Sequence, residues 1–171
     1  MKKTVFTIFL VLLVFYGAAG AFAAEGVQRI LYMEEYEPVY SVDVDNRIWD
    51  VAIDNGDITG VSEDGMMWFF LGDVKDAKDV KDAVLRTEKK IGQYLTDIEI
   101  TQTVEDFTVN GLRAYAYEAL ASANGKDVIL FSVWFQVETG EVGVLLFVMD
   151  PLAEELYFED IMKMTASVSR R

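Results

Sequence analysis

Apolar and polar positions over residues 40–53 are strand-like, and the turn residues that follow, up to residue 71, are those of β-hairpins. Two turns divide this part of the chain, because Asn55-Gly56 and Asp64-Gly65 are pairs that readily adopt the positive φ angles of tight hairpin turns. Residues 66–71 include no polar residue, which predicts a strand covered on both faces. Strands are therefore expected over residues 40–53, 58–61 and 66–71.

Residues 73–95 change to the spacing of an amphipathic helix. Asp73 stands where an N-cap is expected, and Gly92 indicates close packing or a frayed end. Residues 73–82 also repeat acidic and basic residues with a three-residue period. Their acidic row either meets a basic partner or forms a solvated face of i,i+4 ion pairs. The apolar stripe consists of Val74, Ala77, Val80, Val84, Ile91 and Leu95.

Four longer strands follow, separated by turn signals such as Asn110-Gly111 and Asn124-Gly125. They predict an antiparallel meander over residues 98–109, 112–122, 127–137 and 142–149. Residues 144–149 are all apolar, so the last strand is expected at the centre of the sheet. A helix then closes the chain, with an apolar face of Leu152, Leu156, Phe158, Ile161, Met164 and Val168. The elements predict one α+β domain, with an antiparallel sheet sandwiched between helices.

The N-terminus has the three parts of a secretory signal. Lys2 and Lys3 supply the positive charge, residues 4–16 form an uncharged apolar run, and residues 17–24 are mostly small. Cleavage is expected after Ala23, which gives a signal peptide at residues 1–23 and a mature domain at residues 24–171 that begins at Ala24. The mature protein would be periplasmic or secreted and free of the membrane. The alternative is an uncleaved anchor, because residues 4–24 are long enough to span a bilayer.

Composition removes several classes of chemistry. The chain has no His and no Cys, so it lacks the usual ligands for zinc, copper and haem and the usual nucleophile–base pairs. We therefore expect no catalytic residue, no metal site and no cofactor. The 29 acidic residues outnumber the 15 basic ones, for a formal net charge of −14. This charge repels nucleic acid and anionic lipid, so neither is expected as a partner.

Several landmarks stand in a recognisable order within residues 47–169. They are Trp49, a hairpin, Glu63-Asp64-Gly65, an apolar strand, a helix, Asn110-Gly111-Leu112, a strand pair and a last helix ending near Thr165-Ala166-Ser167. In this order the chain resembles the superfamily that contains the photosystem II protein PsbP, the Ran-binding import factor Mog and the bacterial envelope protein DcrB. The resemblance implies a sheet between helices, in a protein that assists or binds other proteins rather than catalysing a reaction. Residues 27–39 depart from this pattern.

Two groups of oxygen-bearing side chains suggest a calcium site as an alternative. Neither group has the spacing of a high-affinity calcium loop, and turn chemistry explains both. The groups are Asp43, Asp45 and Asn46, and Asp54, Asn55 and Asp57.

Tyr, Trp and Arg, the residue types favoured at protein interfaces, gather on two neighbouring strands. Arg113, Tyr115 and Tyr117 share one strand face, and Trp134 stands on the next strand. They form either an interface or a layer buried by a covering helix. The sequence thus predicts a non-catalytic domain of the bacterial envelope that binds an envelope protein. A small-ligand or cation-binding module is the alternative, and a carboxylate-based enzyme is the third.

Overall fold

The computed structural model describes residues 26–34, 37–54, 57–138 and 141–170. The predicted signal peptide, with its cleavage site between Ala23 and Ala24, lies outside the described residues. In the described ranges, no helix is long and apolar enough to cross a membrane.

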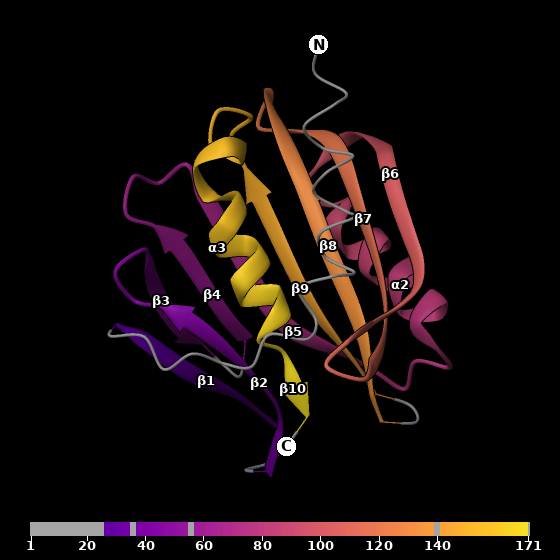
Figure 1. Cartoon of the computed structure of the whole chain (residues 1–171). Helices are drawn as coiled ribbons and strands as arrows, with labels where there is room; N and C mark the ends of the chain where they lie inside the picture. Colours follow the sequence, from indigo (N-terminus) through magenta and orange to yellow (C-terminus); the bar gives the residue numbers. More distant parts are fainter. Residues whose placement is uncertain (1–25, 35–36, 55–56, 139–140, 171) are drawn as a thin grey trace.

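A seven-stranded antiparallel sheet forms the centre of the described structure (Figure 1). Its order is β3 (Trp49–Asp54), β4 (Asp57–Ser62), β5 (Met67–Lys75), β9 (Glu141–Met149), β8 (Lys126–Glu138), β7 (Leu112–Ala123) and β6 (Thr96–Val109). The predicted meander is confirmed as β6 to β9. Asn110 and Asn124 have φ angles of 47° and 51° at its turns, a conformation that Asn tolerates better than most residues. β9 lies between β5 and β8, as the apolar run at residues 144–149 predicts.

A second, three-stranded sheet is built from β1 (Val27–Glu34), β2 (Glu37–Asp45) and the short β10 (Ser169–Arg170). Residues 27–39, which depart from the expected pattern, therefore form β1 and the start of β2. The rings of Tyr32 and Tyr40 stack with centroids 4.9 Å apart, and Tyr40 meets Phe135 of the large sheet edge-on at the same centroid distance. The second sheet thus packs its aromatic face against the first.

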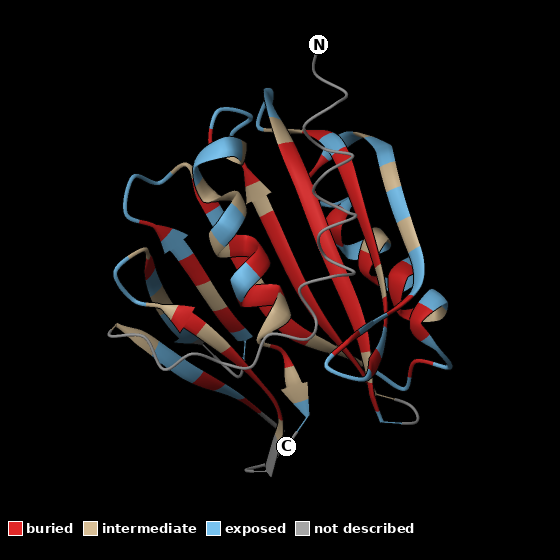
Figure 2. Ribbon diagram, in the orientation of Figure 1, coloured by how far each residue is buried: buried red, intermediate tan, exposed pale blue. Residues whose placement is uncertain are grey.

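The two faces of the large sheet are covered differently. The helix α2 (Val80–Ile91) packs on one face in a cluster with Tyr117, Leu130 and Trp134. The helix α3 (Glu154–Ala166) and the three-stranded sheet share the other cluster, which includes Phe131 and Phe147. Figure 2 shows β8 and β9 buried along most of their length, whereas β6 is largely exposed. The described chain is an α+β fold with antiparallel sheets, but it is richer in strands than expected. On the α3 face, the three-stranded sheet covers much of the area that helices were expected to cover.

The predicted start of α2 at Asp73 is wrong. β5 continues to Lys75, and Val74 pairs with Val142 of β9, so the ladder overrides the helical spacing of this segment. Asp73 instead accepts a hydrogen bond from the Tyr32 hydroxyl. The N-cap is Asp79, whose Oδ1 accepts the backbone N–H of Asp82 at 2.9 Å.

The predicted apolar face of α3 is correct only in its second half. Ile161 and Met164 are buried, whereas Leu152 and Leu156 are 77% and 66% exposed. α3 begins only at Glu154, so Leu152 precedes the helix and lies outside its packed face.

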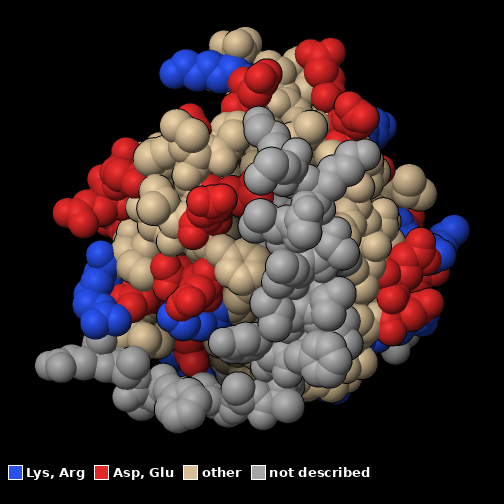
Figure 3. Space-filling model, turned by 45° about the horizontal axis from the view of Figure 1, so that its top comes forward, with Lys and Arg blue, Asp and Glu red and all other residues tan. Residues whose placement is uncertain are grey.

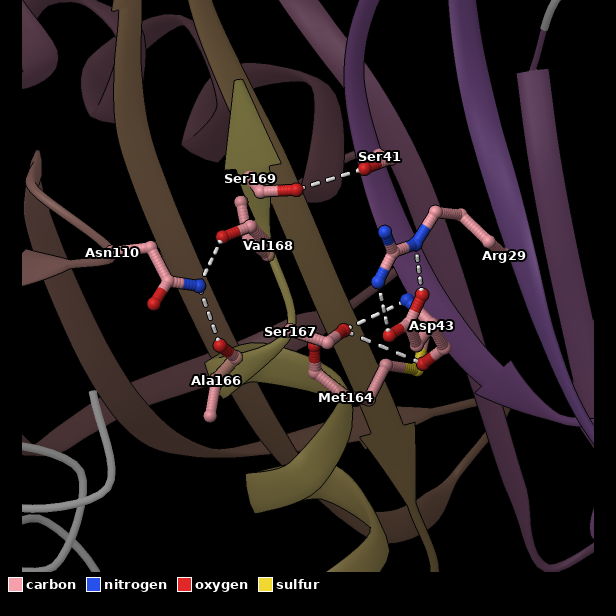
Figure 4. Close-up of polar contacts among 9 residues, drawn as sticks. All are labelled: Arg29, Ser41, Asp43, Asn110, Met164, Ala166, Ser167, Val168 and Ser169. Carbon is pink, nitrogen blue, oxygen red and sulfur yellow. Dashed lines mark hydrogen bonds and ion pairs between the residues drawn. The ribbon is translucent and has the colours of Figure 1, made fainter. Parts of the chain in front are cut away.

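The landmarks at Asn110 and Ser167 meet in space and hold the end of α3 (Figure 4). The Asn110 side-chain amide donates to the carbonyl oxygens of Ala166 at 2.8 Å and Val168 at 2.7 Å. On the other side, the Asp43 backbone N–H donates to Ser167 Oγ at 2.8 Å. The Asn110 bonds satisfy the carbonyl of Ala166, the last residue of α3, and that of Val168 just beyond the helix. These landmarks of the resemblance therefore have a structural role.

Candidate interaction face

The face of the large sheet that carries α2 is only partly covered by it. α2 lies against β5, β7 and β8. Beyond it, Val61 of β4 is 42% exposed and Trp68 of β5 is 36% exposed. The register places Val61 opposite Trp68, and Trp68 opposite Val148 of β9, so these side chains form one row across three strands. With Phe70, which follows Trp68 on the same face, they make up what we call the apolar strip.

Phe70 lies flat on the sheet because Gly72 leaves room for it. A Cβ at Gly72 would come within 2.5 Å of the Phe70 ring. The ring is stacked against Trp68, with centroids 6.4 Å apart and an interplanar angle of 23°. The expectation that residues 66–71 are covered on both faces is therefore wrong on this face: the described chain buries Met67 and Phe69 but leaves Trp68 at the surface.

Acidic side chains border the apolar strip. Asp50 of β3 is exposed and pairs directly with Val61, which extends the row to the edge of the sheet. Glu63 and Asp150 are also exposed, and the backbone N–H of Asp150 donates to Met66 O at 2.9 Å, beside the start of β5. Figure 3 shows acidic side chains spread over another face of the molecule as well. An apolar centre with an acidic border is complementary to a basic partner.

The residues that the sequence suggested as an interface lie on this same face. Tyr117 and Trp134 are fully buried beneath α2, with ring centroids 5.0 Å apart. Trp134 Nε1 donates to Thr87 Oγ1 of α2 at 3.1 Å. Burial raises the pKa of Tyr117 well above its ordinary value, so its hydroxyl stays protonated. Packing under a helix accounts for this pair.

The other two residues of that group are closer to solvent. Arg113 is exposed and pairs with Asp106 at 2.6 Å, while Tyr115 is half-buried against Trp134. Both stand on β7, which β9 and β8 separate from β5. The sequence suggested these two and missed the apolar strip, although the unbroken apolar run at 66–71 was the signal for it.

Two of the side chains proposed as calcium ligands have other partners. Asp43 Oδ1 lies 2.5 Å from Arg29 Nε, and Asp45 Oδ2 lies 2.5 Å from Arg47. The Arg47 guanidinium lowers the pKa of Asp45. Within the described ranges, no group of three or more acidic residues is placed to hold a metal ion. Asn55 lies outside these ranges, so the second group is not fully described.

Comparison with known proteins finds no matching family model and no matching curated sequence. Solved structures do match. Cyanobacterial PsbP (CyanoP) from Synechocystis superposes with a TM-score of 0.60 at 11% identity, over 90% of this chain and 98% of that one. Protein PA94 of unknown function from Pseudomonas aeruginosa gives a TM-score of 0.55 at 13% identity, over 84% and 98%. A crystal structure from Bacteroides thetaiotaomicron gives 0.55 at 14%, over 86% and 49%.

The chain has a PsbP-like fold. The expected resemblance is thereby confirmed at the level of the fold, since identities this low carry no function.

One buried carboxyl in this PsbP-like domain lies away from the α2 face. Glu118 of β7 is 5% exposed, and its Oε2 has no hydrogen-bond partner among the described residues. Burial is the main cause that raises its pKa from 4.5 to about 7, and Glu154 adds repulsion, while a hydrogen bond from Thr101 opposes the shift.

Glu118 should therefore make the stability of the protein depend on pH. Between pH 4.5 and 7 the folded state keeps a proton that the unfolded chain has lost, so the free energy of unfolding falls as pH rises through this window. We expect Glu118→Gln to raise the free energy of unfolding by about 2 kcal/mol at pH 8 and to change it little at pH 4. Urea unfolding at both pH values measures this, with the exposed Glu155→Gln as the control. Equal effects of Glu118→Gln at the two pH values would contradict the assignment of this pH dependence to Glu118.

Proposed function

We propose that this protein is an exported, non-catalytic domain of the bacterial cell envelope that binds another protein through the apolar strip. The row of exposed Val61, exposed Trp68 and half-buried Val148 carries the proposal. A solvent-exposed Trp stacked on Phe70 is a costly surface for a free protein and a typical centre of a binding site.

The surroundings of the apolar strip favour a protein partner. The acidic border and the net charge of −14 repel phosphate-rich surfaces. A basic protein surface with an apolar centre satisfies both features. The PsbP-like fold is compatible with such a role, and the basic, apolar and small-residue order of residues 1–24 supports export to the periplasm or medium.

Site-specific crosslinking in the native host tests the proposal. A photoreactive amino acid in place of Trp68 should capture one reproducible partner, because Trp68 lies at the centre of the apolar strip. The control replaces Leu156, which is 66% exposed on α3 across the sheet. The intact mass of the same purified protein reports whether the chain begins at Ala24.

An adduct at position 68 that is absent at position 156 supports a binding function for the apolar strip. Equal labelling at both positions, or no adduct at position 68, would remove the basis of the proposal.

A further inference from the structure

The two edges of the large sheet differ in how well they resist pairing with another strand. The pairing of β6 with β7 has three register irregularities, and Asp97 and Asp106 of β6 have φ angles of 53° and 56°. Such bulges protect an edge from further pairing. β3 pairs with β4 in an unbroken register over six residues and has no Pro, Lys or Arg. β3 is therefore the unprotected edge.

The hydrogen-bond pattern shows which backbone groups β3 directs outward. The Glu63 N–H donates to Ile48 O at 3.1 Å, which makes residues 48 and 63 a hydrogen-bonded pair. Bonded and non-bonded pairs alternate along an antiparallel ladder. Asp50 and Ala52 therefore bond to β4, while the N–H and C=O groups of Val51 and Ile53 point away from it.

The side chains of β3 present different chemistry on the two faces of the sheet. On the α2 face, exposed Asp50 continues the row of Val61 and Trp68. On the other face, Ile53 is 69% exposed and lies two residues from Val51. An added strand would therefore meet a carboxylate on one face and aliphatic side chains on the other.

We propose that an extended segment of the partner protein, with basic and apolar residues in alternation, adds to β3 as a further strand. Its basic side chains lie beside Asp50 and its apolar side chains cover Ile53, while its backbone bonds to Val51 and Ile53. This inference rests on the proposed function and specifies the partner's segment. A second copy of the chain fits poorly, because it would bring another Asp50 and a further net charge of −14 to the same edge.

Hydrogen exchange measured by NMR tests the pairing directly, with a peptide of alternating Lys and Val, about ten residues long, as the probe. The protein is isotope-labelled and purified from cells that express the full chain. We expect the peptide to slow amide exchange at Val51 and Ile53 by about tenfold or more, because these amides gain partners only in the complex. A peptide of alternating Glu and Val is the matched control and should give no protection.

Two variants distinguish strand addition at the edge of β3 from other effects of the peptide on amide exchange. Val51→Pro removes an outward-pointing N–H and spares the bonds to β4, and Ile53→Lys adds a charge that blocks edges. With the Lys-Val peptide, Val51→Pro should abolish protection at Ile53, and Ile53→Lys should abolish it at Val51. Ile53→Lys keeps the test valid if the proline variant does not fold.

Unchanged exchange at Val51 and Ile53 in saturating Lys-Val peptide would overturn the edge inference. The crosslinking result at Trp68 would still decide the proposed function on its own. Protection of both amides in the free protein as its concentration rises would assign the edge to a second copy, which also overturns the inference.

Discussion

Trp134→Ala is expected to lower the free energy of unfolding by about 4 kcal/mol, the usual cost of deleting a fully buried Trp. Trp134 has no exposed surface, packs against Tyr117, and donates to Thr87 of α2. The substitution leaves a cavity beneath the helix and removes the hydrogen bond that ties α2 to β8. Guanidinium chloride unfolding, followed by far-UV circular dichroism, measures the loss.

Trp68→Ala is the matched control, because it removes the same side chain from a position that is 36% exposed on the same sheet face. We expect it to cost less than about 1.5 kcal/mol in stability and to abolish co-purification of the partner that crosslinking at position 68 identifies. The two tryptophans thus separate a packing role from a binding role. A stability change near zero for Trp134→Ala would instead restore Trp134 to the interface that the sequence suggested.

The meander from β6 to β9 was predictable because its information is local. Short runs rich in apolar residues define the strands, and Asn110-Gly111 and Asn124-Gly125 mark turns where positive φ is required. The start of α2 was not predictable in this way. Residues 73–75 fit a helical stripe as well as a strand, and only the ladder to β9, far along the chain, selects the strand.

The cover of the sheet depends on contacts that no local pattern reveals. β10 pairs with β2 through Ser169 and Ser41, which are separated by most of the chain. The exposure of Trp68 likewise depends on α2 lying over β7, β8 and only part of β5, and not over β4. The apolar run at 66–71 showed that both faces of the strand need cover, but the sequence could not show that one face stays open.

The apolar strip and the edge of β3 adjoin each other through Asp50, which stands on β3 and pairs with Val61 of the strip. Adding a strand at this edge would widen the row of Val61 and Trp68 and place a basic side chain beside the acidic border. The two proposals therefore predict one continuous binding surface, although separate measurements test them.

Asn110→Ala is expected to destabilise the protein by about 2 kcal/mol more than Asn124→Ala. Both residues precede a Gly in a hairpin turn, with φ angles of 47° and 51°, so the backbone cost of placing Ala in the left-handed region is nearly the same in both variants. Only Asn110 bonds to Ala166 O and Val168 O, whereas the Asn124 side chain has no hydrogen bond to any described residue. Each lost bond is worth about 1 kcal/mol, and the freed carbonyls lie where α3 meets β10.

Chemical unfolding of the two variants side by side measures this difference. Hydrogen exchange should also increase at the C-terminal end of α3 in Asn110→Ala alone, because the carbonyls of Ala166 and of Val168 just beyond it lose their partner while the sheet is unchanged. Equal destabilisation by both variants would mean that the Asn110 landmark serves only its own turn. A larger loss of stability in Asn110→Ala, with faster exchange at residues 164–168, would establish that a residue of the β6–β7 turn fixes α3. This helix lies on the face of the sheet opposite to α2.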